Sequence, residues 1–441
     1  MSAVRIEARA GGEHVDGWLC LALVVILGWG MVMVASASVD LGPRINGGSL
    51  YFFWHQLVYM LFGLACAGVV FAVPMRVWQR LSFWLLAGSL AALLVVLVPG
   101  IGLKVNNSRR WIDLVLFQVQ VSEPARLILF VYLASYIVRR QARLQHSLLG
   151  LLPVFLPLGL AAALMLAEPD FGSASMFMIV AVLMLFMGGA RLRDMLGIGV
   201  LLAIVMGLAA VAAPYRVARL MSFLDPWTEA NASGFQLVQS LIAVGRGQWF
   251  GVGLGGSVEK LLYLPEANTD FIFAILAEEL GLAGVVALMA TYAVMVWRGF
   301  VIGRRAERRD ARFEAYLCYG LSTWLGLQVL VNMSVNMGLL PTKGLTLPFV
   351  SYGGSSLITA LLLVALMLRV DYENRGEGRI RRRRDGGEQL RLDFQAQPPV
   401  GVRDARRPRP RLHPVPVPAF SLRGLAFHGG VRLGNQPRGV S

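Results

Sequence analysis

The sequence has few of the side chains that build metal sites and disulfide frameworks. It contains three cysteines and five histidines in 441 residues, and Cys20, Cys66 and Cys318 lie singly within apolar runs. Neither residue type recurs at the spacing of a zinc ligand set, and no histidine stands at ligand spacing from an acidic residue. The sequence therefore predicts no protein-built metal site and no disulfide.

Charged residues are also scarce, at 15% of the chain against 56% hydrophobic residues, whereas a soluble domain carries about a quarter charged residues. Apolar runs near the roughly 20 residues that span a bilayer recur along the chain. These runs cover 17–38, 51–74, 80–99, 122–138, 147–167, 172–189, 194–213, 270–297, 314–338 and 348–369. We therefore expect an all-α polytopic membrane protein with about ten transmembrane helices.

The excess of basic residues, a formal net charge of +15, is unevenly distributed between the loops. With the N-terminus in the cytoplasm, the short outside loops hold only Arg44, Lys104, Arg109, Arg110 and Lys343. The inside segments hold about three times as many basic residues, which is the positive-inside asymmetry of membrane proteins. This distribution predicts an N-in, C-in topology and disfavours a nucleic-acid partner.

The chain divides into three segments by composition. Residues 1–16 form a cytoplasmic N-terminus, and 17–371 form the transmembrane domain. Residues 372–441 form a basic tail rich in proline and arginine, which cannot build a core and is predicted to be disordered in the cytoplasm. Such a tail either lies on anionic lipid or recruits a cytoplasmic partner; an extension without a role is the alternative.

One long outside loop, 214–269, separates the seventh and eighth predicted spans, and long ordered loops are usually functional. Within it Phe235, Val238, Leu241 and Ile242 recur at helical spacing, which predicts a short amphipathic helix at the membrane surface. The glycine-rich run 245–256 lacks the Gly-Lys-Ser/Thr of a phosphate loop. We therefore expect it to be a flexible loop at the membrane surface.

Ionisable residues within the apolar spans are functional candidates because burying charge in a membrane is costly. Glu123 and Arg126 are three residues apart, so they share a helix face and can pair. A structural ion pair and a direct catalytic role both remain open for them. Further polar residues within the predicted spans are Glu278, Glu279, Asn332 and Asn336.

Several motifs resemble the SEDS family of membrane glycosyltransferases, which includes FtsW, RodA and SpoVE. They are 235–240, 263–273, 278–281 and 340–356, and the resemblance extends from the first span to Asp371. The run 341–348, Pro-Thr-Lys-Gly-Leu-Thr-Leu-Pro, is closer to the FtsW branch, which acts in cell division, than to the RodA branch.

The resemblance implies a peptidoglycan glycosyltransferase of the bacterial inner membrane that polymerises lipid II at the division septum, on the periplasmic side. It implies a class B penicillin-binding protein and other divisome membrane proteins as partners. The essential acid of the family falls on Asp270, where a general base could take the proton of the attacking sugar hydroxyl. Asp270 begins a predicted helix, so we expect the helix dipole to favour its ionised form.

The leaving diphosphate requires positive charge, and the basic candidates on the outer side are Arg110, Arg216, Arg219, Lys260 and Lys343. Polar cavity candidates are Gln236, Gln239, Ser240 and Glu266. No cofactor is assigned, although a divalent cation near Asp270 is compatible with this chemistry.

Two positions bear on how the family's roles carry over. Glu123 and Arg126 match the family's Glu–Lys pair beneath the cavity, with Arg in place of Lys. Arginine keeps its charge and pairs through two nitrogens, so we expect the pair to persist. Asn268 stands where the family usually has histidine, so any role of that histidine is in doubt here.

Two other functions compete with polymerisation. A lipid II flippase would need polar groups through the whole membrane thickness, whereas a polymerase needs its indispensable acid at the outer face. The strongest cluster, around Asp270, is peripheral and favours the polymerase. A scaffold that only recruits the transpeptidase would not require the Asp270 motif.

Overall fold

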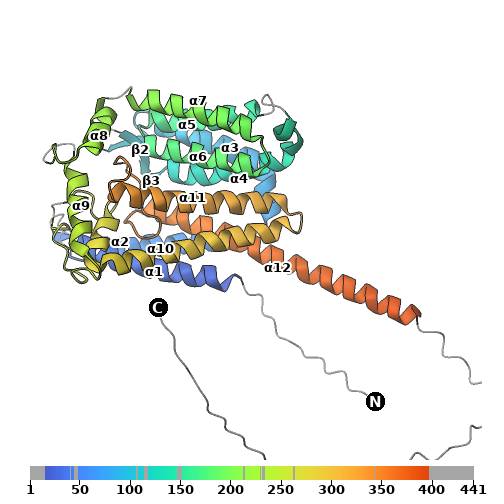
Figure 1. Ribbon diagram of the computed structural model, residues 1–441. Coiled ribbons are helices and arrows are strands. Elements are labelled where there is room, and N and C mark those ends of the chain that lie inside the picture. Colours follow the sequence, from blue (N-terminus) through green and yellow to red (C-terminus); the bar gives the residue numbers. More distant parts are fainter. Residues whose placement is uncertain are drawn as a thin grey trace, which may run out of the picture. The chain divides into compact units, whose positions relative to one another are not determined.

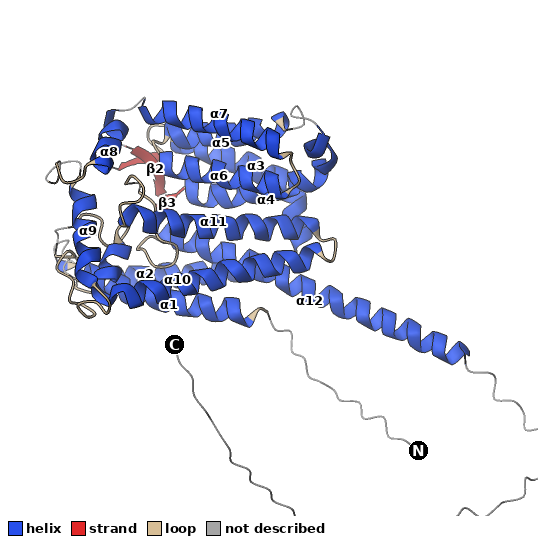
Figure 2. Cartoon of the chain, in the orientation of Figure 1, coloured by secondary structure: helices blue, strands red, loops and turns tan. Residues whose placement is uncertain are grey.

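The computed structural model describes residues 15–39, 41–43, 48–105, 108–113, 118–146, 151–211, 214–228, 230, 234–261, 264–342 and 344–396. Its larger compact unit, residues 1–382, is built mainly of helices packed side by side (Figures 1 and 2). The long helices are α1 (Gly17–Ser38), α2 (Tyr51–Ala72), α3 (Met75–Val96), α4 (Ser122–His146), α5 (Leu152–Ala167), α6 (Phe171–Met187), α7 (Leu192–Val211), α10 (Ile272–Glu307), α11 (Arg312–Asn336) and α12 (Gly354–Ala396).

A helix lies over each apolar run of the sequence, as expected where the backbone must satisfy its own hydrogen bonds in lipid. Within the described residues, five helices are long and apolar enough to cross a membrane: α1, α2, α3, α10 and the 354–376 part of α12. In α10, 67% of the most apolar stretch is buried, against 11% in α2. Helix α10, which packs on α1, α9 and α11, is therefore central, while α2 is peripheral.

The expectation of an all-α fold is wrong in one place. Strands β1 (Gly102–Val105), β2 (Ser108–Asp113) and β3 (Gln118–Gln120) form an antiparallel sheet in the order β1-β2-β3 between α3 and α4. Strands of three to six residues are too short to show a clear alternating pattern in the sequence. The sheet lies at the same end of the bundle as α8 and α9 (Figure 1).

Helices α8 (Pro214–Leu224) and α9 (Phe235–Gly247) run across this end of the bundle, roughly perpendicular to α10 and α11 (Figure 1). The predicted helix in the long loop is confirmed, but its buried face includes Ser240, which sequence reasoning had grouped with the polar residues. The hydroxyl of Ser240 donates to the carbonyl of Asn336, 2.8 Å away. That bond allows a polar side chain to be buried between α9 and α11.

Helix α10 is interrupted at Gly281, whose φ of 64° and ψ of −165° are not helical. The segment 248–253 fills this gap, because its backbone groups bond to those that the interruption of α10 leaves unpaired. We call this pairing of 248–253 with α10 the splice. The amides of Leu282 and Ala283 donate to the carbonyls of Gln248 and Trp249, at 2.9 and 3.0 Å. The carbonyls of Glu278 and Glu279 accept from the amides of residues 252 and 253, both at 3.0 Å.

Three glycines make this splice possible because the two backbones touch. A Cβ on Gly281 would lie 2.4 Å from the amide nitrogen of Gly251, and a Cβ on Gly251 would lie 2.1 Å from the carbonyl oxygen of Glu279. A Cβ on Gly247 would lie 1.9 Å from the carbonyl oxygen of Ala277. The expectation of a flexible surface loop is therefore wrong for 248–253, where glycine serves close packing rather than freedom of movement.

Helix α12 continues beyond Asp371, where the sequence suggested that the tail begins. Two ion pairs between residues one helical turn apart lie at that boundary. Arg369 pairs with Glu373 at 2.8 Å, and Asp371 pairs with Arg375 at 2.7 Å. Pairs at this spacing stabilise a helix. The helix therefore does not end where the apolar residues end.

Candidate active site

Asp270 lies in the turn that leads into α10, with a half-buried side chain. Its backbone carbonyl accepts hydrogen bonds from the side-chain amides of Asn332 and Asn336, both at 3.1 Å. Both asparagines are buried on α11. They fix the backbone of Asp270 through its carbonyl and do not engage its carboxylate.

The segment 344–352 closes on the same turn. The amide of Tyr352 donates to the carbonyl of Asn268 at 2.8 Å, and the hydroxyl of Ser351 donates to the carbonyl of Thr269 at 2.6 Å. At Gly344, a Cβ would lie 3.1 Å from Oδ2 of Asp270. The two loops thus form one hydrogen-bonded unit, and the backbone at 344 approaches the carboxylate itself.

Burial raises the pKa of the Asp270 carboxyl to about 7, and the negative charges of Glu266 and Asp170 act in the same direction. The positive charges of Arg219 and Arg110 lower this pKa without outweighing burial. Asp270 is therefore about half ionised near neutral pH. A carboxylate in this state can both accept and release a proton there.

The helix dipole, which was expected to favour the ionised form of Asp270, does not by itself set the pKa of this carboxyl, which is raised. Helix α10 begins at Ile272 with Phe271 as its N-cap, and no side chain caps it. Asp270 thus lies one residue before the cap. Burial and the neighbouring carboxylates outweigh a dipole whose effect falls off within one turn.

Arg110 and Arg219 are the basic side chains whose charges act on Asp270. Arg110, in β2, donates to the backbone carbonyls of Glu168 and Pro169 at 2.9 and 2.6 Å. Neutral carbonyls hold the guanidinium in place without cancelling its charge. Arg219 lies exposed on α8. Both arginines are therefore suited to contact an anion beside Asp270.

The connection between α5 and α6 supplies two acidic side chains, Glu168 and Asp170. Asp170 caps α6 by accepting from the amide of Ser173, and it also accepts from the hydroxyl of Ser122, both at 3.1 Å. Burial and the charge of Asp170 raise the pKa of Glu168 to about 9, against the opposing charge of Arg110. Glu168 is thus protonated at neutral pH.

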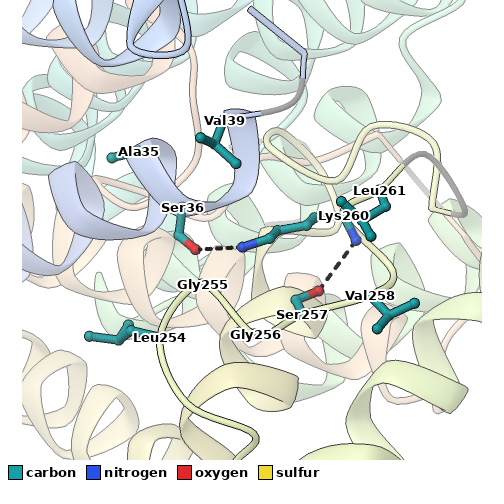
Figure 3. A pocket seen from close by; sticks show the side chains of 10 residues that line it. All are labelled: Ala35, Ser36, Val39, Leu254, Gly255, Gly256, Ser257, Val258, Lys260 and Leu261. Atoms are coloured by element: carbon teal, nitrogen blue, oxygen red, sulfur yellow. Dashed lines mark hydrogen bonds between the residues drawn. The ribbon is translucent and has the colours of Figure 1, made fainter.

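Lys260, another basic candidate, lies in a different place. It is buried, and its Nζ donates to Oε1 of Glu279 at 2.9 Å and to the hydroxyl of Ser36 at 3.2 Å. Figure 3 shows it on the wall of a cavity of about 630 Å³ between the end of α1 and 254–261. Its charge is neutralised by Glu279, and it is not among the charges that act on Asp270.

Glu278 has a parallel role on the same turn of α10. Its carboxylate accepts from the hydroxyl of Ser257 at 2.5 Å and from the amide of Val258 at 3.2 Å. It also pairs with Arg246 of α9 at 3.0 Å. Glu278 and Glu279 therefore fasten the chain between α9 and Asp270 to α10.

The remaining polar candidates are placed as follows. Gln236 and Gln239 are half-buried on α9, while Ser240 points to α11. Glu266 is exposed, and Thr269 donates to its carboxylate at 2.8 Å. Lys343 lies outside the described residues, and Arg216 lies on α8 outside the described side chains.

The predicted pairing of Glu123 with Arg126 is present as an ion pair on α4. Both residues are buried, and the guanidinium carbon of Arg126 lies 5.2 Å from the ring centre of Trp324 on α11. Phe130 stacks on the same ring, with centroids 5.3 Å apart. The pair thus joins α4 to α11 in the core of the bundle.

Within the residues described, no cluster of three or more histidine, cysteine, aspartate or glutamate side chains could hold a metal ion. The acidic groups near Asp270 are Glu266 and Asp170. They are oxygen donors of the kind that magnesium accepts. A divalent cation at Asp270 stays a prediction.

Known proteins resemble this chain over most of its length. The family model described as "Cell cycle protein", FtsW/RodA/SpoVE, matches residues 17–376. A probable peptidoglycan glycosyltransferase FtsW of Thioalkalivibrio sulfidiphilus is 47% identical over 390 residues, which cover 86% of this chain and 98% of the relative. The chain belongs to the FtsW/RodA/SpoVE family.

Solved structures agree with this family assignment. A structure described as "Structural coordination of polymerization and crosslinking by a peptidoglycan synthase complex" matches with a TM-score of 0.67 and 28% identity, over 82% of this chain and 98% of the other. The rod shape determining protein RodA of Thermus thermophilus matches with a TM-score of 0.60 and 26% identity, over 81% of this chain and 96% of RodA. The bundle is thus the FtsW/RodA/SpoVE fold.

Sequence reasoning missed three features of this family member's site. It did not single out Asp170 as a charge acting on Asp270, although the Glu-Pro-Asp break between two apolar runs was visible. It did not connect Lys260 with Glu279, or either of them with Ser36. Those contacts join distant parts of the chain and leave no local signal.

Proposed function

We propose that this chain is a peptidoglycan glycosyltransferase that polymerises lipid II into glycan strands at the division septum of the bacterial inner membrane. The observation that carries the proposal is the state of Asp270. Its carboxyl has a pKa of about 7 and lies in the field of Arg110 and Arg219. Two relatives of the chain, at 47 and 50% identity, are named probable peptidoglycan glycosyltransferases.

Asp270 acts as the general base. It takes the proton of the attacking sugar hydroxyl, the oxygen forms the new glycosidic bond, and the bond from the donor sugar to its diphosphate breaks. Undecaprenyl diphosphate leaves with the bonding electrons, and Arg110 and Arg219 stabilise its charge. A base with a pKa near the working pH combines sufficient ionisation with sufficient basicity. A divalent cation near Asp270 would add positive charge at the diphosphate.

The membrane arrangement is part of the proposal. Residues 17–371 form the catalytic domain with about ten spans, both termini are cytoplasmic, and 214–269 is periplasmic. The sheet, α8 and α9 lie at one end of the bundle, which suits an extramembrane face (Figure 1). A cysteine at position 245, exposed on α9, should react with an impermeant reagent added from the periplasmic side. Reaction only from the cytoplasmic side would overturn the topology.

A class B penicillin-binding protein is the proposed partner, together with other divisome membrane proteins. The support is indirect: a peptidoglycan synthase complex that couples polymerisation and crosslinking contains a chain with this fold. Crosslinking of the strands would then take place on the partner, and polymerisation on this chain. The partner should therefore be present in any assay of activity.

Asp270→Asn in the purified complex with the transpeptidase tests the catalytic assignment. Loss of general-base catalysis should reduce glycan strand synthesis from lipid II by about 10² to 10⁴-fold, in the presence of a penicillin-type inhibitor. Folding should be unchanged because the Asp270 side chain does not cap α10. Asp225→Asn is the matched control, since Asp225 is exposed and only caps a turn through the amide of Thr228.

The Asp225→Asn complex should synthesise strands at the wild-type rate. Near-wild-type synthesis by folded Asp270→Asn would remove Asp270 from the catalytic machinery. The flippase and the scaffold would then become the leading functions. Assaying lipid II transport across vesicles by the same variant would separate those two.

A further inference from the structure

The segment 248–256, part of which is spliced into α10, presents a compact set of apolar side chains to the exterior. Trp249 is 70% exposed, Phe250 84%, Val252 42% and Leu254 60%. No charged residue lies between Arg246 and Glu259. Such a concentration of exposed aromatic and aliphatic side chains marks a surface that is covered by something apolar.

The splice fixes the level of this surface along α10. The carbonyl of Trp249 is bonded to the amide of Ala283. From Ala283 to Trp297, α10 advances fourteen residues, or about 21 Å at about 1.5 Å per residue. Trp297 is 56% exposed, and the guanidinium carbon of Arg298 lies 5.3 Å from its ring centre.

An exposed tryptophan beside an arginine is typical of the membrane–water boundary. The apolar core of a bilayer is about 30 Å thick. With Trp297 at the inner boundary, Ala283 lies below the outer boundary of that core rather than above it. Between these levels α10 exposes Val286 and Met289, at 56 and 45%, as a lipid-facing helix does.

We propose that 248–256 is inserted into the outer leaflet of the bilayer, where Trp249 and Phe250 contact lipid and anchor this end of the domain. The inference rests on the membrane orientation proposed above and does not depend on catalysis. Its occupant is the lipid itself, because the level of the segment along α10 and its lack of charge both match the boundary of the apolar core.

The splice reduces the main obstacle to non-helical backbone in lipid, which is unpaired polar groups. The carbonyls of Gln248 and Trp249 and the amides of residues 252 and 253 are bonded to α10, and the amide of Gly251 is bonded to the carbonyl of Gly247 at 2.7 Å. The segment therefore enters the leaflet with part of its backbone already paired. Its aromatic side chains then hold α9, which ends at Gly247, at a fixed height.

Depth measurement by spin labelling tests the proposal. Phe250→Cys, in a chain in which Cys20, Cys66 and Cys318 are replaced by alanine, is labelled with a nitroxide and reconstituted into phosphatidylglycerol–phosphatidylethanolamine vesicles. Collisions with oxygen, which partitions into lipid, are compared with collisions with a water-soluble nickel chelate. Labels at Val286 and Thr228, an exposed α10 residue and an exposed loop residue, give the lipid and water references.

The label at 250 should be accessible to oxygen and protected from the nickel chelate, as the Val286 reference is, rather than accessible to nickel as at Thr228. A label at Leu254→Cys provides a second reading should the first variant fold poorly. Nickel accessibility like that at Thr228 in both variants would overturn the proposal. Accessibility that is lost only when the transpeptidase is added would also overturn it, since the surface would then be a protein interface.

Discussion

The pH dependence of strand synthesis follows from the charges around Asp270. With a pKa of about 7, the carboxyl is about 10% ionised at pH 6 and about 90% ionised at pH 8, so a reaction limited by the ionised base should accelerate about ninefold between them. The acid limb of kcat/KM, measured with lipid II and the partner complex, should have its midpoint near pH 7.

Two substitutions should move that midpoint in opposite directions. Glu266→Gln removes a negative charge that raises the pKa of Asp270, so the base ionises more easily and the midpoint should fall. Arg219→Ala removes a positive charge that lowers this pKa, so the midpoint should rise. Arg219→Ala should also lower the maximal rate of strand synthesis, because it removes a proposed diphosphate contact. The midpoint of the profile is therefore compared separately from that rate.

A profile that is flat between pH 6 and pH 8 would refute a limiting base with a pKa of about 7. Shifts of the midpoint in the same direction for both variants would refute the electrostatic argument even if Asp270 is essential. Asp225→Asn, which changes none of the charges that act on Asp270, should leave the midpoint unchanged. Measuring transpeptidation separately would exclude titration of the partner.

Three further predictions concern the framework. Glu123→Ala leaves Arg126 buried without its partner, so thermal unfolding in detergent should show a loss of about 3–5 kcal/mol; an unchanged transition would contradict this. Gly281→Ala places a side chain at a φ of 64° against Gly251 and should cost at least about 1–3 kcal/mol, whereas Gly88→Ala, in open space on α3, should not destabilise. Truncation after Arg375 keeps its ion pair with Asp371 and should leave strand synthesis intact; lost synthesis would give the tail a catalytic role.

The parts of the fold that sequence predicted are those fixed by local rules. The helices follow from apolar runs, because a backbone in lipid has few alternatives to helix. Glu123 and Arg126 pair because three residues separate them on one helix.

The parts that sequence did not predict depend on contacts between distant segments. Lys260 has the same charge as Arg110, and nothing local shows that Glu279 neutralises one while backbone carbonyls hold the other. The pKa of Asp270 depends on burial by the assembled loops and on Asp170, a hundred residues earlier. The interruption of α10 is invisible in an apolar run because Gly281 resembles the other glycines of that run.

The splice between 248–253 and α10 also constrains which length changes the chain can accept. Two carbonyls and two amides of that segment must meet two positions on each side of Gly281, at 278 and 279 and at 282 and 283, so a single insertion between Gln248 and residue 253 would misalign at least one pair of bonds. Among related chains, insertions and deletions should therefore accumulate before Phe235, in the stretch between α8 and α9, and be excluded from the six residues that repair the helix.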